Sequence, residues 1–234
     1  MQSNNSHLSR SQTRGRMNSP DRTVLIYQDI RLKVSDVETL RPGEWLNDQI
    51  ISFYFQYLES HIYRHYLHDI LLVSTQVTQL MKMTKDHHED ARSILEPLNF
   101  RLKQYLFFPL NNNDDERVGG THWSLMVYSR SENSFYTFDS INKNINDAAT
   151  KLYHVLKIVL FCPSAQHFCF PSLQQQNNFD CGIHVICNVE NIIEHIIRFD
   201  SDGKVESVPV LTLDHVLQKR TAILGIIRAL GGNI

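Results

Sequence analysis

The spacing of hydrophobic residues predicts helices toward both ends of the chain and strands in its middle. Apolar residues that recur every three or four positions are typical of helices that bury one face. This pattern predicts helices over residues 35–41, 44–61, 74–83, 144–161, 181–199 and 212–230. Short runs that alternate or are continuously apolar predict strands over residues 24–27, 104–111, 122–129, 134–139 and 167–170. Strands grouped between helices indicate an α+β protein.

The first 22 residues differ from the rest of the chain. They are rich in serine, asparagine and arginine, and Leu8 and Met17 are their only large apolar side chains after Met1. Such a segment buries too little surface to offset the entropy lost on ordering. We therefore expect a disordered tail over residues 1–22 and a single folded domain over residues 23–234.

Composition and charge exclude several classes of protein. The 234 residues include 42% hydrophobic and 21% charged residues, and the net charge is −2, so no basic surface for nucleic acid is indicated. The longest apolar runs are far shorter than the roughly 20 residues of a membrane-spanning helix, and no secretory signal is visible. Four cysteines are too few for a disulfide scaffold. We expect a monomeric protein of a reducing compartment, cytoplasmic or nuclear, that binds neither membrane nor nucleic acid.

Cys181 is the first candidate for chemistry. It follows a polar loop, residues 174–180, and opens a strongly apolar predicted helix. The positive end of the helix dipole favours a thiolate at this position. Two interpretations remain open on this pattern alone, a catalytic nucleophile and a buried structural cysteine. Cys187 lies within the same apolar helix and is expected to be a core residue.

His122 and Asp139 are predicted to lie side by side. His122 stands where a Gly-Gly turn enters one predicted strand, and Asp139 ends the next strand along the chain. An antiparallel hairpin brings the start of its first strand near the end of its second. A carboxylate in that place orients an imidazole, and the imidazole can activate a thiol. Gln175, in the polar loop before Cys181, could donate to a developing oxyanion.

These residues form part of a longer set of motifs. The set is Trp45-Leu46-Asn47-Asp48, Gly120-Thr121-His122-Trp123-Ser124, Phe138-Asp139-Ser140, and Gln174-Gln175 with Phe179-Asp180-Cys181-Gly182. Together they resemble the Ulp-type cysteine proteases, the sentrin-specific proteases that process SUMO and related modifiers. The likeness covers about residues 24–230 and is strongest to the branch of deneddylases. Phe179 and His184 depart from it, since tyrosine is usual at the first position and an aromatic residue is common at the second.

The resemblance implies a fold, an activity and a set of roles. It implies an α+β, papain-like fold in which a helical part that carries Cys181 packs on a central mixed β-sheet that carries His122 and Asp139. Cys181 would be the nucleophile, His122 the general base and acid, Asp139 the orienting carboxylate and Gln175 the oxyanion donor. Trp45 and Trp123 would enclose the Gly-Gly terminus of the substrate, and Asp48 would hold its extended tail. The resemblance thus implies substrate-binding roles for Trp45, Asp48 and Trp123.

The implied substrate is a ubiquitin-like modifier of the Nedd type, released from its precursor or from conjugates such as cullins, without cofactor or metal. Two alternatives remain: a SUMO-specific isopeptidase with the same catalytic residues, and a catalytically silent binder of ubiquitin-like proteins.

Two further side-chain groups have competing interpretations. The histidines at 61, 65, 68, 87 and 88 could suggest a metal site, but the glutamate of a metalloprotease helix is missing between His61 and His65. The tyrosines at 54, 57, 63 and 66 could suggest a platform for nucleic acid, but no basic residues are interleaved in the required stripe. We expect no metal site at the histidines and core packing for the tyrosines.

Overall fold

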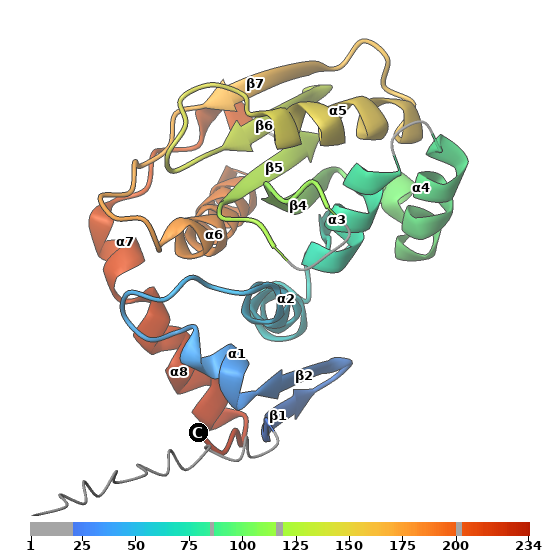
Figure 1. Cartoon of the computed structure of the whole chain (residues 1–234). Coiled ribbons are helices and arrows are strands. Elements are labelled where there is room, and N and C mark those ends of the chain that lie inside the picture. Colours follow the sequence, from blue (N-terminus) through green and yellow to red (C-terminus); the bar gives the residue numbers. More distant parts are fainter. Residues whose placement is uncertain (1–20, 85–86, 116–118, 200–202) are drawn as a thin grey trace, which may run out of the picture.

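The computed structural model describes residues 21–84, 87–115, 119–199 and 203–234 (Figure 1). Within these ranges the strands are β1 (Thr23–Tyr27), β2 (Ile30–Lys33), β3 (Ile70–Leu72), β4 (Tyr105–Asn111), β5 (Trp123–Ser129), β6 (Ser134–Phe138) and β7 (Gln166–Phe170). The α-helices are α1 (Val34–Glu38), α2 (Asp48–Tyr57), α3 (Thr75–Met83), α4 (His88–Leu95), α5 (Asp147–Val159), α6 (Cys181–Phe199), α7 (Leu213–Leu217) and α8 (Lys219–Ala229).

The expected N-terminal tail falls almost wholly outside the described residues. Its last two residues are described, and both contact the start of α1. The carboxylate of Asp21 accepts hydrogen bonds from the backbone and hydroxyl of Ser35. The carbonyl of Arg22 accepts a hydrogen bond from Val34. The described residues therefore include the last two of the predicted tail.

A mixed five-stranded sheet forms the centre of the molecule. Its strand order is β3-β4-β5-β6-β7. The three middle strands are antiparallel, whereas β3 runs parallel to β4 and β7 runs parallel to β6. The hairpin of β5 and β6 turns at Asn133, whose φ of 47° is tolerated by asparagine. This sheet and its helices confirm the predicted α+β class.

Both faces of the sheet are covered by helices, and alternate residues of each strand enter different cores. Leu125 and Val127 of β5 join the core on the side of α2 and α6. Met126 and Tyr128 of the same strand join the core on the side of α3, α4 and α5. Such two-sided burial explains why these strands read as almost continuous apolar runs in the sequence.

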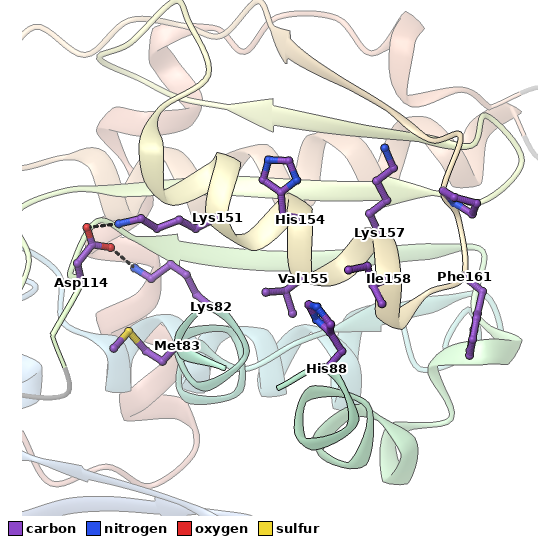
Figure 2. Close-up of a pocket in the computed structure, with 11 residues that line it drawn as sticks. Lys82, Met83, His88, Asp114, Lys151, His154, Val155, Lys157, Ile158 and Phe161 are labelled. Carbon is purple, nitrogen blue, oxygen red and sulfur yellow. Dashed lines mark hydrogen bonds and ion pairs between the residues drawn. The ribbon is translucent and has the colours of Figure 1, made fainter. Parts of the chain in front are cut away.

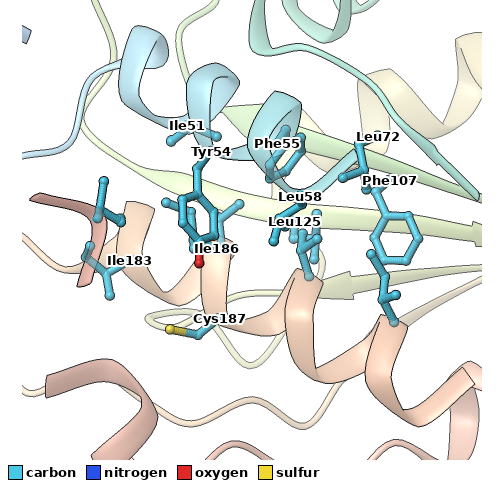
Figure 3. Close-up of a cluster of buried hydrophobic side chains, with 14 of the residues drawn as sticks. Ile51, Tyr54, Phe55, Leu58, Leu72, Phe107, Leu125, Ile183, Ile186 and Cys187 are labelled. Atoms are coloured by element: carbon cyan, nitrogen blue, oxygen red, sulfur yellow. The ribbon is translucent and has the colours of Figure 1, made fainter. Parts of the chain in front are cut away.

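The packing of α2 on α6 fixes the position of Cys181 (Figure 3). Side chains of α2, among them Ile51 and Tyr54, face Ile183 and Ile186 of α6. All four are at most 3% exposed, and each aliphatic side chain buried in this way stabilises the fold by about 1.5–3 kcal/mol. The first turn of α6 is thereby held against the chain segment that enters α2.

A smaller layer lies beyond α2, where α1, α8 and the β1–β2 hairpin come together (Figure 1). The C-terminus closes it, because the backbone N–H of Asn233 donates to the carbonyl of Val24. This layer brings α8, the last helix, next to the residues that precede α2.

Two predicted helices differ from the structure, and short elements were not predicted. The predicted helix over 44–61 begins only at Asp48, because the side chain of Asn47 caps the helix by accepting a hydrogen bond from the N–H of Ile50. The predicted helix over 212–230 is divided at Gln218 into α7 and α8. The strand β2 was not predicted, since its four residues, Ile30–Lys33, are too few to show alternation.

Candidate active site

Cys181 is the first residue of α6 and lies at the base of a groove. The carbonyl of Asp180 accepts the first hydrogen bond of the helix, from the N–H of His184. The Cys181 side chain is therefore next to the N–H groups at the positive end of the helix dipole. Only 3% of the residue is exposed. The groove has a volume of about 780 Å³, and His122 also lines it.

The predicted proximity of His122 and Asp139 is confirmed. The Nε2 atom of His122 lies 2.8 Å from Oδ1 of Asp139, and both residues are buried. This pairing assigns the Nε2 proton to the bond with the carboxylate. The other ring nitrogen, Nδ1, is buried, and it makes no hydrogen bond of normal distance and angle to any described residue. It is the atom left to exchange a proton with the thiol.

Asp139 is held by more donors than His122 alone. Its Oδ1 accepts from the backbone N–H groups of Ile141 and Asn142 at 2.9 and 3.0 Å. Its Oδ2 accepts from the side-chain amides of Asn142 and Asn146 at 3.2 and 3.0 Å. Burial alone would raise the pKa of Asp139, but the hydrogen bonds from His122 and from this turn lower it to about 2. The carboxylate is thus ionised and fixed in direction.

The charge of His122 follows from its two neighbours. Burial by itself lowers the pKa of His122, whereas the hydrogen bond to Asp139, the charge of Asp139 and the neighbouring Cys181 raise it, and the result is a pKa of about 9. A pKa of about 9 leaves the His122 imidazole protonated at neutral pH, next to the cysteine that it serves. The site can therefore supply both a nucleophile and a proton donor.

Gln175 lies next to the residues that follow β6, and both ends of its side-chain amide are engaged. Its Oε1 accepts from the hydroxyl of Ser140 at 2.7 Å, and its Nε2 donates to the carbonyl of Asn177 at 2.7 Å. A primary amide carries a second N–H, which makes no hydrogen bond among the described residues. Gln174 is oriented elsewhere, because its Nε2 donates to the carbonyls of Asp139 and Ser172. The structure therefore separates these two adjacent glutamines.

The three predicted substrate-binding residues line the same groove as Cys181. Trp45 stands on the segment before α2 and is 46% exposed. Trp123 is half-buried, and its Nε1 donates to the carbonyl of Leu46 at 3.0 Å, which ties the two tryptophan-bearing segments together. Asp48 begins α2, and α3 supplies the facing wall of the groove through Gln76 and Gln79.

A second cavity is lined by residues of α3, α4 and α5 and has a volume of about 1070 Å³ (Figure 2). Its buried Lys82 bonds to the carbonyls of Asn111 and Asn113, and it shares Asp114 with Lys151. Burial lowers the pKa of Lys82. The cavity contains no cysteine. By these bonds Lys82 holds Asn111 and Asn113, which also line the groove of Cys181.

The histidines and tyrosines considered for other functions have packing or surface partners. His61 bonds to Tyr27 at 2.9 Å and stacks on Tyr57, while Tyr54 and Tyr63 are buried. No group of three potential metal ligands occurs among the described residues.

His184 is 3% exposed, and burial lowers its pKa. In the described part of the chain no helix has the length and apolar character needed to cross a membrane.

Sequence reasoning missed Asn142 and Asn146. Asn146 caps α5 through its Oδ1, which accepts from the N–H of Ala149, while its Nδ2 reaches Asp139. An asparagine before a predicted helix is a readable cap signal. Its second bond depends on the end of β6 and the start of α5 meeting in space.

The site combines a cysteine at a helix N-terminus with an imidazole and a buried carboxylate on a facing sheet. Together with the groove, these features define a cysteine protease of papain-like architecture. The model of the Ulp1 protease family, C-terminal catalytic domain, matches residues 44–222. This chain belongs to that family.

Individual relatives agree with the family assignment. The chain is 35% identical over 202 residues to sentrin-specific protease 8 of Rattus norvegicus, a match that covers 86% of this chain and 91% of the relative. It is 31% identical over 179 residues to NEDD8-specific protease 1 of Arabidopsis thaliana, covering 75% and 77%. Among solved structures, the C-terminal Ulp1 protease domain in complex with Smt3, the yeast ortholog of SUMO, has a similar fold. It has a TM-score of 0.62 and 19% identity, with 92% of this chain and 90% of that chain covered.

Proposed function

We propose that this chain is a cysteine protease that cleaves after the C-terminal Gly-Gly of a ubiquitin-like modifier of the Nedd type. The observation that carries the proposal is the constellation of Cys181, His122 and Asp139 at the base of a groove with tryptophans along its walls. The printed names of relatives at 31–35% identity, NEDD8-specific protease 1 and sentrin-specific protease 8, favour the Nedd-type branch. Residues 23–234 would form the catalytic unit.

The reaction begins when the Sγ thiolate of Cys181 attacks the carbonyl carbon of the last glycine. The negative charge that develops on the carbonyl oxygen is stabilised by the second N–H of Gln175 and by the backbone N–H of Cys181. His122 then passes its Nδ1 proton to the leaving amine as the C–N bond breaks, which leaves a thioester on Cys181. Asp139 keeps the imidazole in the required orientation throughout.

Water completes the cycle. His122, now neutral, accepts a proton from a water molecule, whose oxygen attacks the thioester carbonyl. The C–S bond breaks, the modifier leaves with a free carboxylate, and the thiolate–imidazolium pair is restored. The leaving amine can belong to a peptide extension or to a lysine of a conjugate such as a cullin, so one site serves precursor processing and deconjugation.

The groove accounts for selection of the substrate tail. Trp45 and Trp123 both line the groove with Cys181, so we assign the Gly-Gly terminus to the space beside them. The carboxylate of Asp48 is available to accept backbone N–H groups of the extended tail. Four free thiols among the described residues suit a reducing compartment, the cytoplasm or nucleus.

A cleavage assay with three matched precursors tests the proposal. A Nedd-type modifier, SUMO and ubiquitin, each with a short peptide after Gly-Gly, are incubated with the protein, and kcat/KM is measured for each. We expect the Nedd-type precursor to be cleaved at least about 100-fold more efficiently, which corresponds to about 2.7 kcal/mol of discrimination. Preference for SUMO would assign the chain to the other branch, and binding without cleavage would make it a silent binder.

A further inference from the structure

Arg220, on α8, contacts both chain segments that lead into the groove. Its side chain is only 12% exposed. The guanidinium donates to the carboxylate of Asp180, at 3.0 Å from Nε and 2.9 Å from Nη2. It also donates to four backbone carbonyls, those of Thr39, Arg41, Glu44 and Phe179, at 2.7–3.2 Å. A single side chain thus bonds residues that are about 140 positions apart in the sequence.

The first set of contacts holds the segment that carries Trp45. Residues 39–44 connect α1 to the start of the groove, and this connection turns at Gly43 with a φ of 90°. Three backbone carbonyls of this segment accept hydrogen bonds from Arg220. A turn with little regular structure of its own depends on such bonds for a single conformation. The position of Trp45, directly after Glu44, depends on them in turn.

The second set leads to the oxyanion donor. Asp180 accepts from Arg220 through Oδ1 and from the side chain of Asn177 through Oδ2, at 2.8 Å. The Asn177 Oδ1 accepts from the backbone N–H groups of Phe179 and Asp180, both at 3.0 Å. The carbonyl of Asn177 in turn receives the Nε2 of Gln175. The chain of contacts therefore runs from Arg220 through Asp180 and Asn177 to Gln175.

We infer that Arg220 is a positioning residue that fixes the Trp45 segment and the Gln175 amide relative to each other. The inference rests on the proposed function, because both targets are assigned roles only there. Arginine suits this task because its planar guanidinium presents five N–H donors in fixed directions. Lysine at this position could keep the charge opposite Asp180, but its single ammonium group cannot reach all of the carbonyls at once.

Arg220→Lys separates positioning from charge, and Arg228→Lys on the exposed side of the same helix is its matched control. Turnover of the modifier precursor is compared with the rate of Cys181 alkylation by iodoacetamide, which needs the thiolate but neither Trp45 nor Gln175. We expect Arg220→Lys to lower kcat/KM about 10–100-fold, as misplacement of substrate and oxyanion donor does. Alkylation should stay within about two-fold of the wild type.

Equal losses in turnover and alkylation would overturn the inference, since they would show only that less protein is folded. A kcat/KM within about three-fold of the wild type would overturn it as well. Failure of the wild type and of Arg228→Lys to cleave any modifier would instead refute the proposed function.

Asn177→Ala tests the second set of contacts without touching α8. We expect a fall in kcat with little change in KM, because the substrate tail does not need Gln175 to bind. In the double variant with Arg220→Lys, the fold-loss in kcat should be smaller than the product of the two single fold-losses, as expected for residues of one network. A double variant that shows the full product would contradict the coupling between Arg220 and Gln175.

Discussion

Asp139 shows most clearly how single residues set the chemistry of the site. It accepts five hydrogen bonds from four residues, which are His122, Ile141, Asn142 and Asn146. A carboxylate satisfied in this way stays ionised, and it raises the pKa of the imidazole that it faces. The same contacts prevent rotation of Asp139, so His122 keeps Nδ1 toward the position of the thiol.

The pH dependence of turnover tests this electrostatic coupling. The pKa of His122 is raised to about 9, so the imidazolium persists through neutral pH and is lost as the pH rises through that value. We expect the alkaline limb of the kcat/KM profile near pH 9. Asp139→Asn removes the negative charge, so the limb should move to lower pH and kcat should fall by about ten-fold or more. An unchanged limb would show that Asp139 does not control the protonation of His122.

The amide of Gln175 can be tested against its neighbour in the sequence. Gln175→Ala removes one oxyanion donor, and we expect kcat to fall about 100-fold, within the range for such donors. KM should change little, because the ground-state carbonyl carries less charge. Gln176→Ala, at an exposed position of the same loop, is the control and should retain wild-type kinetics. Equal effects of the two substitutions would argue against the assigned role.

At the scale of elements, the start of α6 is fitted closely to the segment before α2. A Cβ atom added at Gly182 would lie 2.8 Å from the Cβ of Leu46, nearer than real Cβ contacts allow. The carbonyl of Leu46 also accepts the bond from Trp123. Glycine at 182 is thus required by the close approach of the two segments that carry Cys181 and Trp45.

Two glycine substitutions make this requirement measurable. Gly182→Ala must displace Leu46 and the adjoining Trp45, and we expect kcat/KM to fall at least about ten-fold. Gly225→Ala, within α8, meets no atom within 4 Å, and it should raise the free energy of unfolding by about 0.5–1 kcal/mol without changing kinetics. Unchanged turnover in folded Gly182→Ala would show that the contact with Leu46 is unimportant.

The elements also show how far sequence reasoning reached. Strands β4 to β7 and helices α3, α5 and α6 were predicted because their hydrophobic pattern is strong and local. The pairing of His122 with Asp139 followed from the hairpin. Arg220 could not have been found in this way, since its partners at 39–44 and 179–180 meet α8 only through the packing of distant segments.

At the scale of the whole molecule, the carboxyl group of Glu59 is held at a cost to the stability of the fold. Burial raises the pKa of Glu59 to about 7, against which a backbone hydrogen bond from Leu72 and the charge of Lys103 act only in part. The folded state therefore binds the Glu59 proton more tightly than the unfolded state does. Stability falls as the pH rises from about 4.5, the value for an unperturbed carboxyl, to about 7.

Glu59→Gln should remove this pH-dependent loss. Measured by urea unfolding at pH 8, we expect the variant to be more stable than the wild type by about 1–3 kcal/mol. At pH 4.5 most of the advantage should disappear, because the wild-type carboxyl is then protonated in the folded state and half protonated in the unfolded state. Glu89→Gln, at an exposed position, should shift stability little at either pH. A constant difference between Glu59→Gln and the wild type across this range would contradict a partly buried Glu59 that titrates near pH 7.

Covalent labelling followed by intact mass measurement tests the central claim most directly. The protein is incubated with a Nedd-type modifier, SUMO and ubiquitin, each carrying an electrophile in place of the C-terminal carboxylate. Cys181→Ala is the control; it retains Cys187, whose burial raises its pKa to about 12. We predict an adduct of one modifier per chain with the Nedd-type probe alone, absent in Cys181→Ala. An adduct that persists in Cys181→Ala, or no adduct with any probe on folded protein, would contradict the account.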